Sequence, residues 1–254
     1  GISAESLLGA DLIVLSPGVP PSRPAIANAR AKGIAITGEI ELASRFISAP
    51  IVGITGTNGK STVTSLCGAI AEATGRPSFC GGNLGTPLIE AVGTKATSED
   101  GIVVVELSSY QLETVDTLRC HAATILNLTP DHLDRYDSLD AYGDAKARIF
   151  RHLPPLGTRV WNADDPVALA LCHRSQGPQQ PAYLFSTRGP VPTQYFMERS
   201  LRLGGWLQGS DLVLSGVEGG LAGCVDSRGA TLPTEHYPTS ALQLVGRHNL
   251  SNTL

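Results

Sequence analysis

The stretch ITGTNGKST at positions 54–62 brings together glycines, a lysine and hydroxyl groups. Gly56 and Gly59 allow the backbone to approach a ligand closely, and Lys60 can reach terminal phosphates. The hydroxyl side chains that end the stretch can serve Mg²⁺, a hard cation that prefers oxygen ligands. These residue types predict a phosphate-binding loop.

The loop departs from the strict phosphate-loop pattern at one position, because Ile54 stands where the pattern has a glycine. Its surroundings nevertheless fit, since an apolar run at 49–53 precedes it and helical spacing follows it, with Gly75 expected to end the helix. Such a helix directs unpaired N–H groups and its positive dipole end toward an anion. An ordinary turn with an exposed lysine is the alternative, which this context disfavours. The expected apolar face comprises Val63, Leu66, Cys67, Ile70 and Thr74.

A carboxylate comes at the end of a second apolar run. Residues 101–107 are largely β-branched, as in a parallel strand covered on both faces. Open parallel sheets place ligands outside the carboxyl ends of their strands, so Glu106 could hold a Mg²⁺ that bridges phosphate oxygens. The alternative is that Glu106 caps the following helix, but the phosphate loop favours the metal role.

The segment NLTPDHLDRY at 127–136 also begins at a strand end, since it overlaps the last two residues of the apolar run 123–128. A lone histidine is more often structural than a ligand. His132, however, lies among two carboxylates and an arginine. We therefore interpret His132 as a site residue.

Lys146 lies in a helical pattern that starts near Ser138. The apolar residues of this pattern are Leu139, Tyr142, Ile149 and Leu153. Lys146 stands four residues after the tyrosine and three before the isoleucine, which places it on the same inward face. It could be a site residue that needs a partner, or a lysine whose stem packs while its ammonium reaches water. The spacing leaves both readings open.

The elements that position these residues alternate between strands and helices. The first unit comprises strands at 11–15 and 34–36 and a helix at 23–32 that Gly33 ends; a helix follows at about 38–46. Further strands are expected at 159–162 and 183–186, glycine-rich hairpins at 196–225 and the start of a helix at 246–252. The boundary at 49–50 divides the chain into regions 1–49 and 50–254. The pattern predicts an α/β fold, and both ends of the chain look cut.

Composition narrows the classes of protein. The 254 residues could form one large or two modest domains. A net charge of −4 without basic runs makes nucleic acid an unexpected partner. Five scattered cysteines without a CxxC pair suggest neither disulfides nor zinc. Without a long apolar span or a signal peptide, we expect a soluble, cytoplasmic protein and no membrane partner.

Six motifs in one order carry a family resemblance: GTNGKST, GGNLG, ELSSYQLE, NLTPDHLDRY, YGDAKARIF and GRHNLSN. The chain resembles the Mur ligase family of peptidoglycan synthesis over essentially its whole length, and ELSSYQLE most resembles the D-glutamate-adding branch. The resemblance implies a parallel-sheet central ATPase domain of the phosphate-loop type, preceded by part of a Rossmann-like, UDP-binding α/β domain. The family's C-terminal domain would be absent.

The resemblance also implies roles for individual residues. ATP would be bound by Gly56, Thr57, Asn58, Gly59, Lys60, Ser61, Thr62 and, at the adenine, Asn249. Mg²⁺ would be held by Ser61, Glu106, His132 and a carbamylated Lys146. The UDP-sugar substrate would contact Ser16 and Gly18 at its diphosphate, and also Asn83, Ser108 and Gln111. Lys60, His132 and Lys146 would be the catalytic residues, although the spacing between the last two is one residue shorter than the resemblance leads us to expect.

The implied reaction is ATP-dependent amide formation through an acyl phosphate, with UDP-N-acetylmuramoyl-L-alanine and D-glutamate as substrates and a monomeric enzyme. One alternative is a ligase similar to folylpolyglutamate synthase, against which the N-terminal strand–helix–strand unit argues. A nucleotide-dependent switch is a second, but the chain has no NKxD element for reading a base. A third is a folded, nucleotide-binding fragment without turnover.

Overall fold

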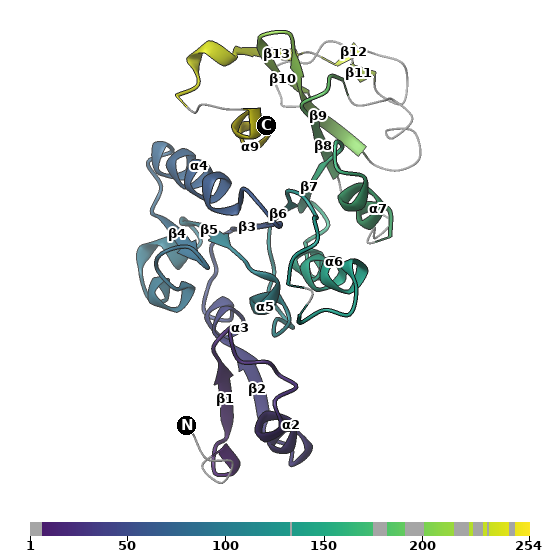
Figure 1. The fold of residues 1–254 in the computed structure, drawn as a ribbon. Helices are drawn as coiled ribbons and strands as arrows, with labels where there is room; N and C mark the ends of the chain where they lie inside the picture. Colours follow the sequence, from purple (N-terminus) through teal and green to yellow (C-terminus); the bar gives the residue numbers. More distant parts are fainter. Residues whose placement is uncertain are drawn as a thin grey trace.

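The structure is a computed structural model that describes residues 7–132, 134–174, 182–190, 201–215, 224–225, 231–232, 234–243 and 247–254. A small two-stranded unit lies at one end and a hairpin region at the other, with the main sheet between them (Figure 1). None of the helices in these ranges combines the length and apolar content that crossing a membrane requires.

The N-terminal unit confirms the expected strand–helix–strand order. Strand β1 (Leu12–Leu15) pairs in parallel with β2 (Ala35–Gly38), and helix α2 (Pro24–Ala31) connects them. Gly33 adopts a positive φ of 84° just after the helix, a conformation that glycine takes without steric cost. The small core of this unit consists of Ile13, Leu15, Ile26 and Ala29.

Helix α3 (Glu39–Ser44) joins this unit to the main sheet. Glu41 on α3 is fully buried, and its Oε2 accepts hydrogen bonds of 2.9, 3.0 and 3.1 Å from the backbone N–H groups of residues 116, 117 and 118. Its Oε1 accepts from the Thr117 hydroxyl and the Arg45 guanidinium. A single carboxylate therefore connects α3 to residues 116–118 by hydrogen bonds.

The main sheet confirms the α/β expectation. In the described part of the chain its strand order is β13-β10-β9-β8-β7-β6-β3-β5-β4, parallel from β4 to β9 and antiparallel at β10 and β13. Its strands are β3 (Ile51–Thr55), β4 (Ser78–Gly82), β5 (Ile102–Glu106), β6 (Ala122–Ile125), β7 (Thr158–Asn162), β8 (Ala182–Ser186), β9 (Leu201–Gln208), β10 (Asp211–Ser215) and β13 (Thr234–Pro238). The pair β9–β10 confirms a hairpin in the glycine-rich region. A separate short pair consists of β11 (Cys224–Val225) and β12 (Thr231–Leu232).

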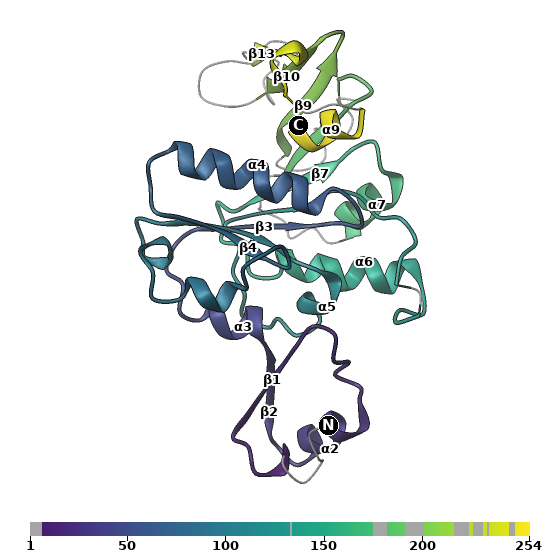
Figure 2. The ribbon, with the colours of Figure 1, turned by 60° about the vertical axis from the view of Figure 1, so that its left-hand side comes forward.

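Helices cover both faces of the parallel part, with α4 on one face and α5 and α6 on the other (Figure 2). The α-helices after α3 are α4 (Lys60–Ala73), α5 (Ser109–Leu112), α6 (Leu139–Ala147), α7 (Pro166–Arg174) and α9 (Arg247–Thr253). Short 3-10 turns are η1 (Leu88–Ala91), η2 (Lys95–Thr97), η3 (Arg148–Phe150) and η4 (Thr239–Ala241). The helix expected at 246–252 corresponds to α9, although residue 246 lies outside the described residues.

The buried face of α4 corrects the sequence expectation. Ile70 is 67% exposed, although the apolar spacing placed it on the inner face. The residues of α4 that are buried are Val63, Thr64, Gly68 and Ala71. At Gly68, a Cβ atom would stand only 2.7 Å from the sulfur of Cys80 on β4. Small residues let this helix approach the sheet closely, so its inner face carries little apolar signal.

Candidate active site

The predicted phosphate loop connects β3 directly to the N-terminus of α4. Gly59 precedes the helix in a left-handed conformation with φ of 82°, and Gly56 has φ of 148°. Helix α4 begins at Lys60, whose Nζ donates a 3.0 Å hydrogen bond to the Thr57 carbonyl oxygen. The loop therefore has the backbone that the sequence predicts, with the helix N-terminus available to an anion.

Lys146 lies beneath this loop. Its side chain is buried, with the residue 1% exposed, and its Nζ donates to the Gly56 carbonyl oxygen at 2.9 Å and to Thr55 Oγ1 at 3.4 Å. The same nitrogen stands 4.6 Å from the centre of the Tyr142 ring. Of the two readings that the sequence left open, the solvent-reaching lysine is therefore wrong.

The surroundings of Lys146 favour its uncharged form. The pKa of Lys146 is lowered from 10.5 to about 7, first by burial and second by the positive charge of Lys60. The negative charges of Asp131 and Glu106 oppose this shift. At neutral pH, a substantial share of the Lys146 amine is therefore a free base.

Glu106 ends β5 beside the start of the loop, because β5 pairs with β3 in the register Ile54↔Glu106. The residue is 2% exposed, and its Oε1 accepts a 2.7 Å hydrogen bond from Asn83 Nδ2. Its Oε2 is buried and has no hydrogen-bond partner among the described residues. A buried carboxylate oxygen without a donor fits a hard cation such as Mg²⁺.

The cap of α5 is Ser108, and the helix-capping alternative for Glu106 is therefore wrong. The Ser108 hydroxyl accepts from the Gln111 backbone N–H at 3.2 Å, and Gln111 Oε1 accepts from the Ser108 backbone N–H at 2.9 Å. This capping box gives both residues a structural role at α5. Their predicted contacts with substrate stay predictions.

His132 stands on an exposed loop at the same end of the sheet. Its backbone has a positive φ of 52°, and its side chain is 42% exposed. The ring centre lies 4.8 Å from that of Tyr110 and 6.1 Å from that of Tyr142. Within the described residues, no three His, Cys, Asp or Glu side chains form a cluster that could hold a metal. The structure thus brings His132 near Tyr142, which lies beside Lys146. It shows no ready-made group of metal-binding side chains in the described residues.

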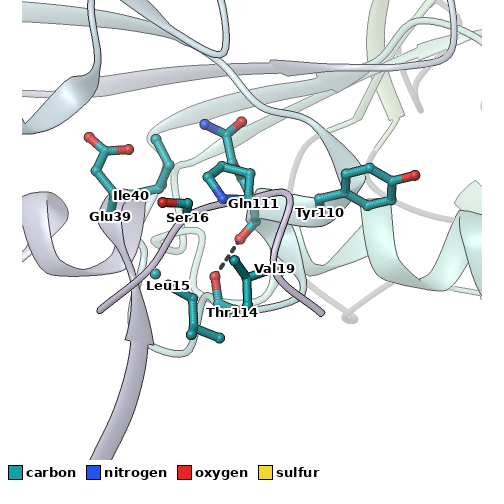
Figure 3. Close-up of a pocket in the computed structure, with 10 residues that line it drawn as sticks. Leu15, Ser16, Val19, Glu39, Ile40, Tyr110, Gln111 and Thr114 are labelled. Carbon is teal, nitrogen blue, oxygen red and sulfur yellow. Dashed lines mark hydrogen bonds between the residues drawn. The ribbon is translucent and has the colours of Figure 1, made fainter. Parts of the chain in front are cut away.

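A pocket between the N-terminal unit and α5 contains two of the predicted substrate residues. Its lining comprises Leu15, Ser16, Pro17, Val19, Gly38, Glu39, Ile40, Tyr110, Gln111 and Thr114. Ser16 comes from the loop after β1, and Gln111 comes from α5. The hydroxyl of Thr114, just after α5, donates a 3.0 Å hydrogen bond to the Gln111 carbonyl oxygen (Figure 3). Gly18 lies between two lining residues but does not line the pocket itself, and Asn83 lies at Glu106 instead.

Helix α9 brings the predicted adenine residue toward the loop. Asn252 Nδ2 donates to Asn249 Oδ1 at 3.2 Å. The Asn252 side chain also lies so close to Gly59 that a Cβ there would be 2.5 Å from Asn252 Oδ1. Asn252 of the last described helix therefore lies beside the loop, and Asn249 is hydrogen-bonded to Asn252.

Sequence reasoning did not single out Tyr142 or Asn252 as parts of this arrangement, and it named Thr57 only as an ATP-binding residue of the loop. The Thr57 and Tyr142 hydroxyl groups are 3.4 Å apart, and Thr57 Oγ1 donates to the Thr129 carbonyl oxygen at 3.2 Å. Tyr142 was recognised only as an apolar position of α6. Its spacing of four residues from an inward lysine was the available signal.

Comparisons with known families match nearly the whole chain. The description "Mur ligase middle domain" matches residues 54–254. The description "Mur ligase MurD-like, N-terminal domain" matches residues 1–38. The two matches leave residues 39–53 between them, and the boundary expected at 49–50 stays a prediction.

Curated relatives point in the same direction. A UDP-N-acetylmuramoylalanine--D-glutamate ligase of Anaeromyxobacter dehalogenans is 46% identical over 257 aligned residues, covering 100% of this chain and 50% of the relative. The protein of the same name from Nitrosococcus oceani is 41% identical over 254 residues, covering 100% and 49%. The chain therefore spans about half the length of the curated relatives it matches.

Solved structures show the same fold at low identity. A UDP-N-acetylmuramate:L-alanyl-gamma-D-glutamyl-meso-diaminopimelate ligase from Neisseria meningitides has a TM-score of 0.60 at 18% identity, covering 100% of this chain and 75% of its own. A murein peptide ligase from Psychrobacter arcticus has a TM-score of 0.58 at 19% identity, covering 100% and 53%. At such identities the likeness supports the fold alone.

Proposed function

Because the chain belongs to the Mur ligase family, we propose that it is the nucleotide-binding part of an ATP-dependent ligase that adds D-glutamate to UDP-N-acetylmuramoyl-L-alanine. The observation that carries the proposal is the hydrogen bond from buried Lys146 to Gly56, which brings a lysine amine beneath the phosphate loop. The match of residues 1–38 to a MurD-like domain favours D-glutamate addition over addition to a folate.

In the proposed reaction, the substrate carboxylate attacks the γ-phosphate of ATP, and the amine of D-glutamate then displaces phosphate from the acyl phosphate. Backbone N–H groups of residues 59–62, the dipole of α4 and Lys60 bind the ATP phosphates. Asn249 on α9 contacts the adenine. Both reactants are anionic, so positive charge must offset their repulsion before they can react.

Mg²⁺ held by Glu106 and Ser61 would supply part of that positive charge. Glu106 offers the buried Oε2, and Asn83 fixes the carboxylate through Oε1. His132 and Lys146 complete the proposed catalytic group.

Lys146 is proposed to act as a carbamate. Its uncharged amine forms an N–C bond with CO₂ and loses one proton, which converts a neutral group beside Lys60 into an anion that suits a hard cation. A carbamate signal from isotope-labelled bicarbonate that disappears in Lys146→Ala tests this step. A bare amine at saturating bicarbonate would contradict it.

The UDP-sugar is proposed to enter between the two regions of the chain. Ser16 and Gln111 line the pocket there, while Gly18 faces the diphosphate and Ser108 and Asn83 lie further toward the phosphate loop. Residues 1–49 then belong to the UDP-binding domain and residues 50–254 to the ATPase domain. The proposed enzyme is monomeric and cytoplasmic, and its product serves peptidoglycan synthesis and hence cell shape and division.

Calorimetry with ATP, with and without Mg²⁺, and with UDP-N-acetylmuramoyl-L-alanine tests the proposal. Lys60→Ala should weaken ATP binding about 30-fold, because hydrogen bonds between charged groups contribute about 1.5–3 kcal/mol. Lys95→Ala is the matched control, since Lys95 is exposed in η2. Unchanged ATP affinity in Lys60→Ala would overturn the phosphate-loop assignment.

A further inference from the structure

The phosphate loop is held along its length by the segment that follows β6. Pairing of β3 with β6 ends at Thr55↔Ile125. Beyond it, the Leu126 N–H donates to the Thr55 carbonyl oxygen at 3.0 Å. The Thr57 N–H then donates to the Asn127 carbonyl oxygen at 3.1 Å. The two segments therefore continue to pair after the regular strands have ended.

The side chain of Asn127 extends this pairing to the tip of the loop. Its Oδ1 accepts from the Asn58 N–H at 2.8 Å, and its Nδ2 donates to the Asn58 carbonyl oxygen at 2.9 Å. An amide side chain thus forms both hydrogen bonds that a facing peptide group would form. It fixes the N–H and the carbonyl of one loop residue at the same time.

Thr57 adds a third connection to the same segment. Its Oγ1 donates to the Thr129 carbonyl oxygen at 3.2 Å and accepts from the Thr129 N–H at 3.1 Å. His132 lies three residues after Thr129 on this segment. The phosphate loop and the segment that carries His132 are therefore held together by side chains from both sides.

We propose that Asn127 is a positioning residue that sets the shape of the phosphate loop before the nucleotide binds and fixes that loop to the His132 segment. The chain has Ile54 where a strict phosphate loop has glycine. Hydrogen bonds from Asn127, just after β6, help to fix the shape of its loop. A ligand binds more weakly when the competent conformation is only partly populated. The role of Asn127 is to keep that population high.

This inference rests on the proposed nucleotide-binding function, and its test uses two readouts on the whole chain. Asn127→Ala should weaken binding of Mg-ATP about tenfold, equivalent to about 1.4 kcal/mol, and leave binding of the UDP-sugar within about twofold. In the absence of nucleotide, the variant should also show faster amide hydrogen exchange at residues 56–60.

Asn162→Ala is the matched control. Asn162 ends the next strand, β7, and its amide also makes two hydrogen bonds, donating to the Leu126 carbonyl oxygen and accepting from the Asp164 N–H, both at 2.9 Å. Neither bond involves the phosphate loop. This variant should lower thermal stability but keep exchange at residues 56–60 and ATP affinity near those of the unsubstituted chain.

Three binding results would overturn the inference: unchanged ATP affinity in Asn127→Ala, an equal loss in both variants, or an equal loss for ATP and the UDP-sugar. If the unsubstituted chain binds no ATP, the proposed function fails instead. The exchange measurement separates the two cases, because unchanged exchange at residues 56–60 in Asn127→Ala contradicts the role of Asn127 whether or not ATP binds.

Discussion

Glu106 illustrates how the surroundings of a single side chain can favour a cation at one of its atoms. One of its oxygens is bonded to Asn83, while the other is buried without a donor among the described residues. Leaving a charged acceptor in this state costs free energy. A cation at this oxygen would remove that cost.

We expect Glu106→Gln to weaken Mg²⁺-dependent ATP binding at least roughly tenfold, because the amide keeps an acceptor but loses the charge that holds a hard cation. Titrations with Mg²⁺ and with a chelator measure the difference. Glu72→Gln, at an exposed position of α4, provides the control. An equal loss of affinity in the chelator would indicate a structural role for Glu106 instead.

Residue identities could be predicted from the sequence only where a local pattern carried them. The glycines and Lys60 lie within one nine-residue stretch, whereas the partners of Lys146 in the loop are 90 and 91 positions away. The sequence left Lys146 undecided because its burial depends on β3 and the phosphate loop. Asn127 was visible only as the first residue of a motif, since its contacts with Asn58 span 69 positions.

At the scale of elements, long apolar runs predicted strands well. Where glycines and other small residues stand, as in β4 and on part of the inner face of α4, the prediction failed. Strands β3, β5, β6, β7 and β8 all overlap the expected runs. Strand β4 was missed because its sequence SFCGG contains two glycines. Helix α7 was also missed. The inner face of α4 was assigned only in part: Val63 packs against Ile54 and Val104 of the sheet as expected, but Ile70 is exposed, and the small Gly68 contacts β4 instead.

Helix α3 supports a prediction about stability. Glu41→Gln should lower the free energy of unfolding by about 3 kcal/mol, because it disrupts a buried carboxylate that accepts from three consecutive backbone N–H groups. Urea unfolding of the variant beside Glu90→Gln, an exposed change in η1, measures this difference. A loss no larger than that of the control would show that other contacts hold α3.

The same carboxylate gives stability a pH dependence. Burial alone would raise the pKa of Glu41, but hydrogen bonds from Thr117, residue 116 and Arg45 together lower it below 4.5. A folded-state pKa below the unfolded value contributes stability that is present above about pH 4.5 and lost as pH falls through the folded pKa. Glu41→Gln should therefore make the free energy of unfolding depend less on pH in this acidic range.

At the scale of the whole molecule, the two candidate binding regions lie on the described chain, while relatives are about twice as long. Positioning of reactants can lower a barrier by roughly 7–11 kcal/mol, and this chain aligns with only about half of each relative. We expect the chain to bind both ATP and the UDP-sugar yet to release no phosphate at a useful rate when D-glutamate is added. A phosphate-release assay measures this, with a full-length relative as positive control. Robust D-glutamate-dependent release would show that the acceptor site lies within these residues.

The strand order determines when, during synthesis, the phosphate loop can gain the partners that shape it. Strand β3 pairs with β5 and β6, both of which leave the ribosome after it, and the loop it carries is held by Asn127 and Lys146. Closing such distant contacts must precede their stabilising effect. A nascent chain that ends before residue 127 therefore contains every residue of the phosphate loop but lacks the partners that shape it. On this account, ATP can stabilise the growing chain only after Asn127 and Lys146 have been made.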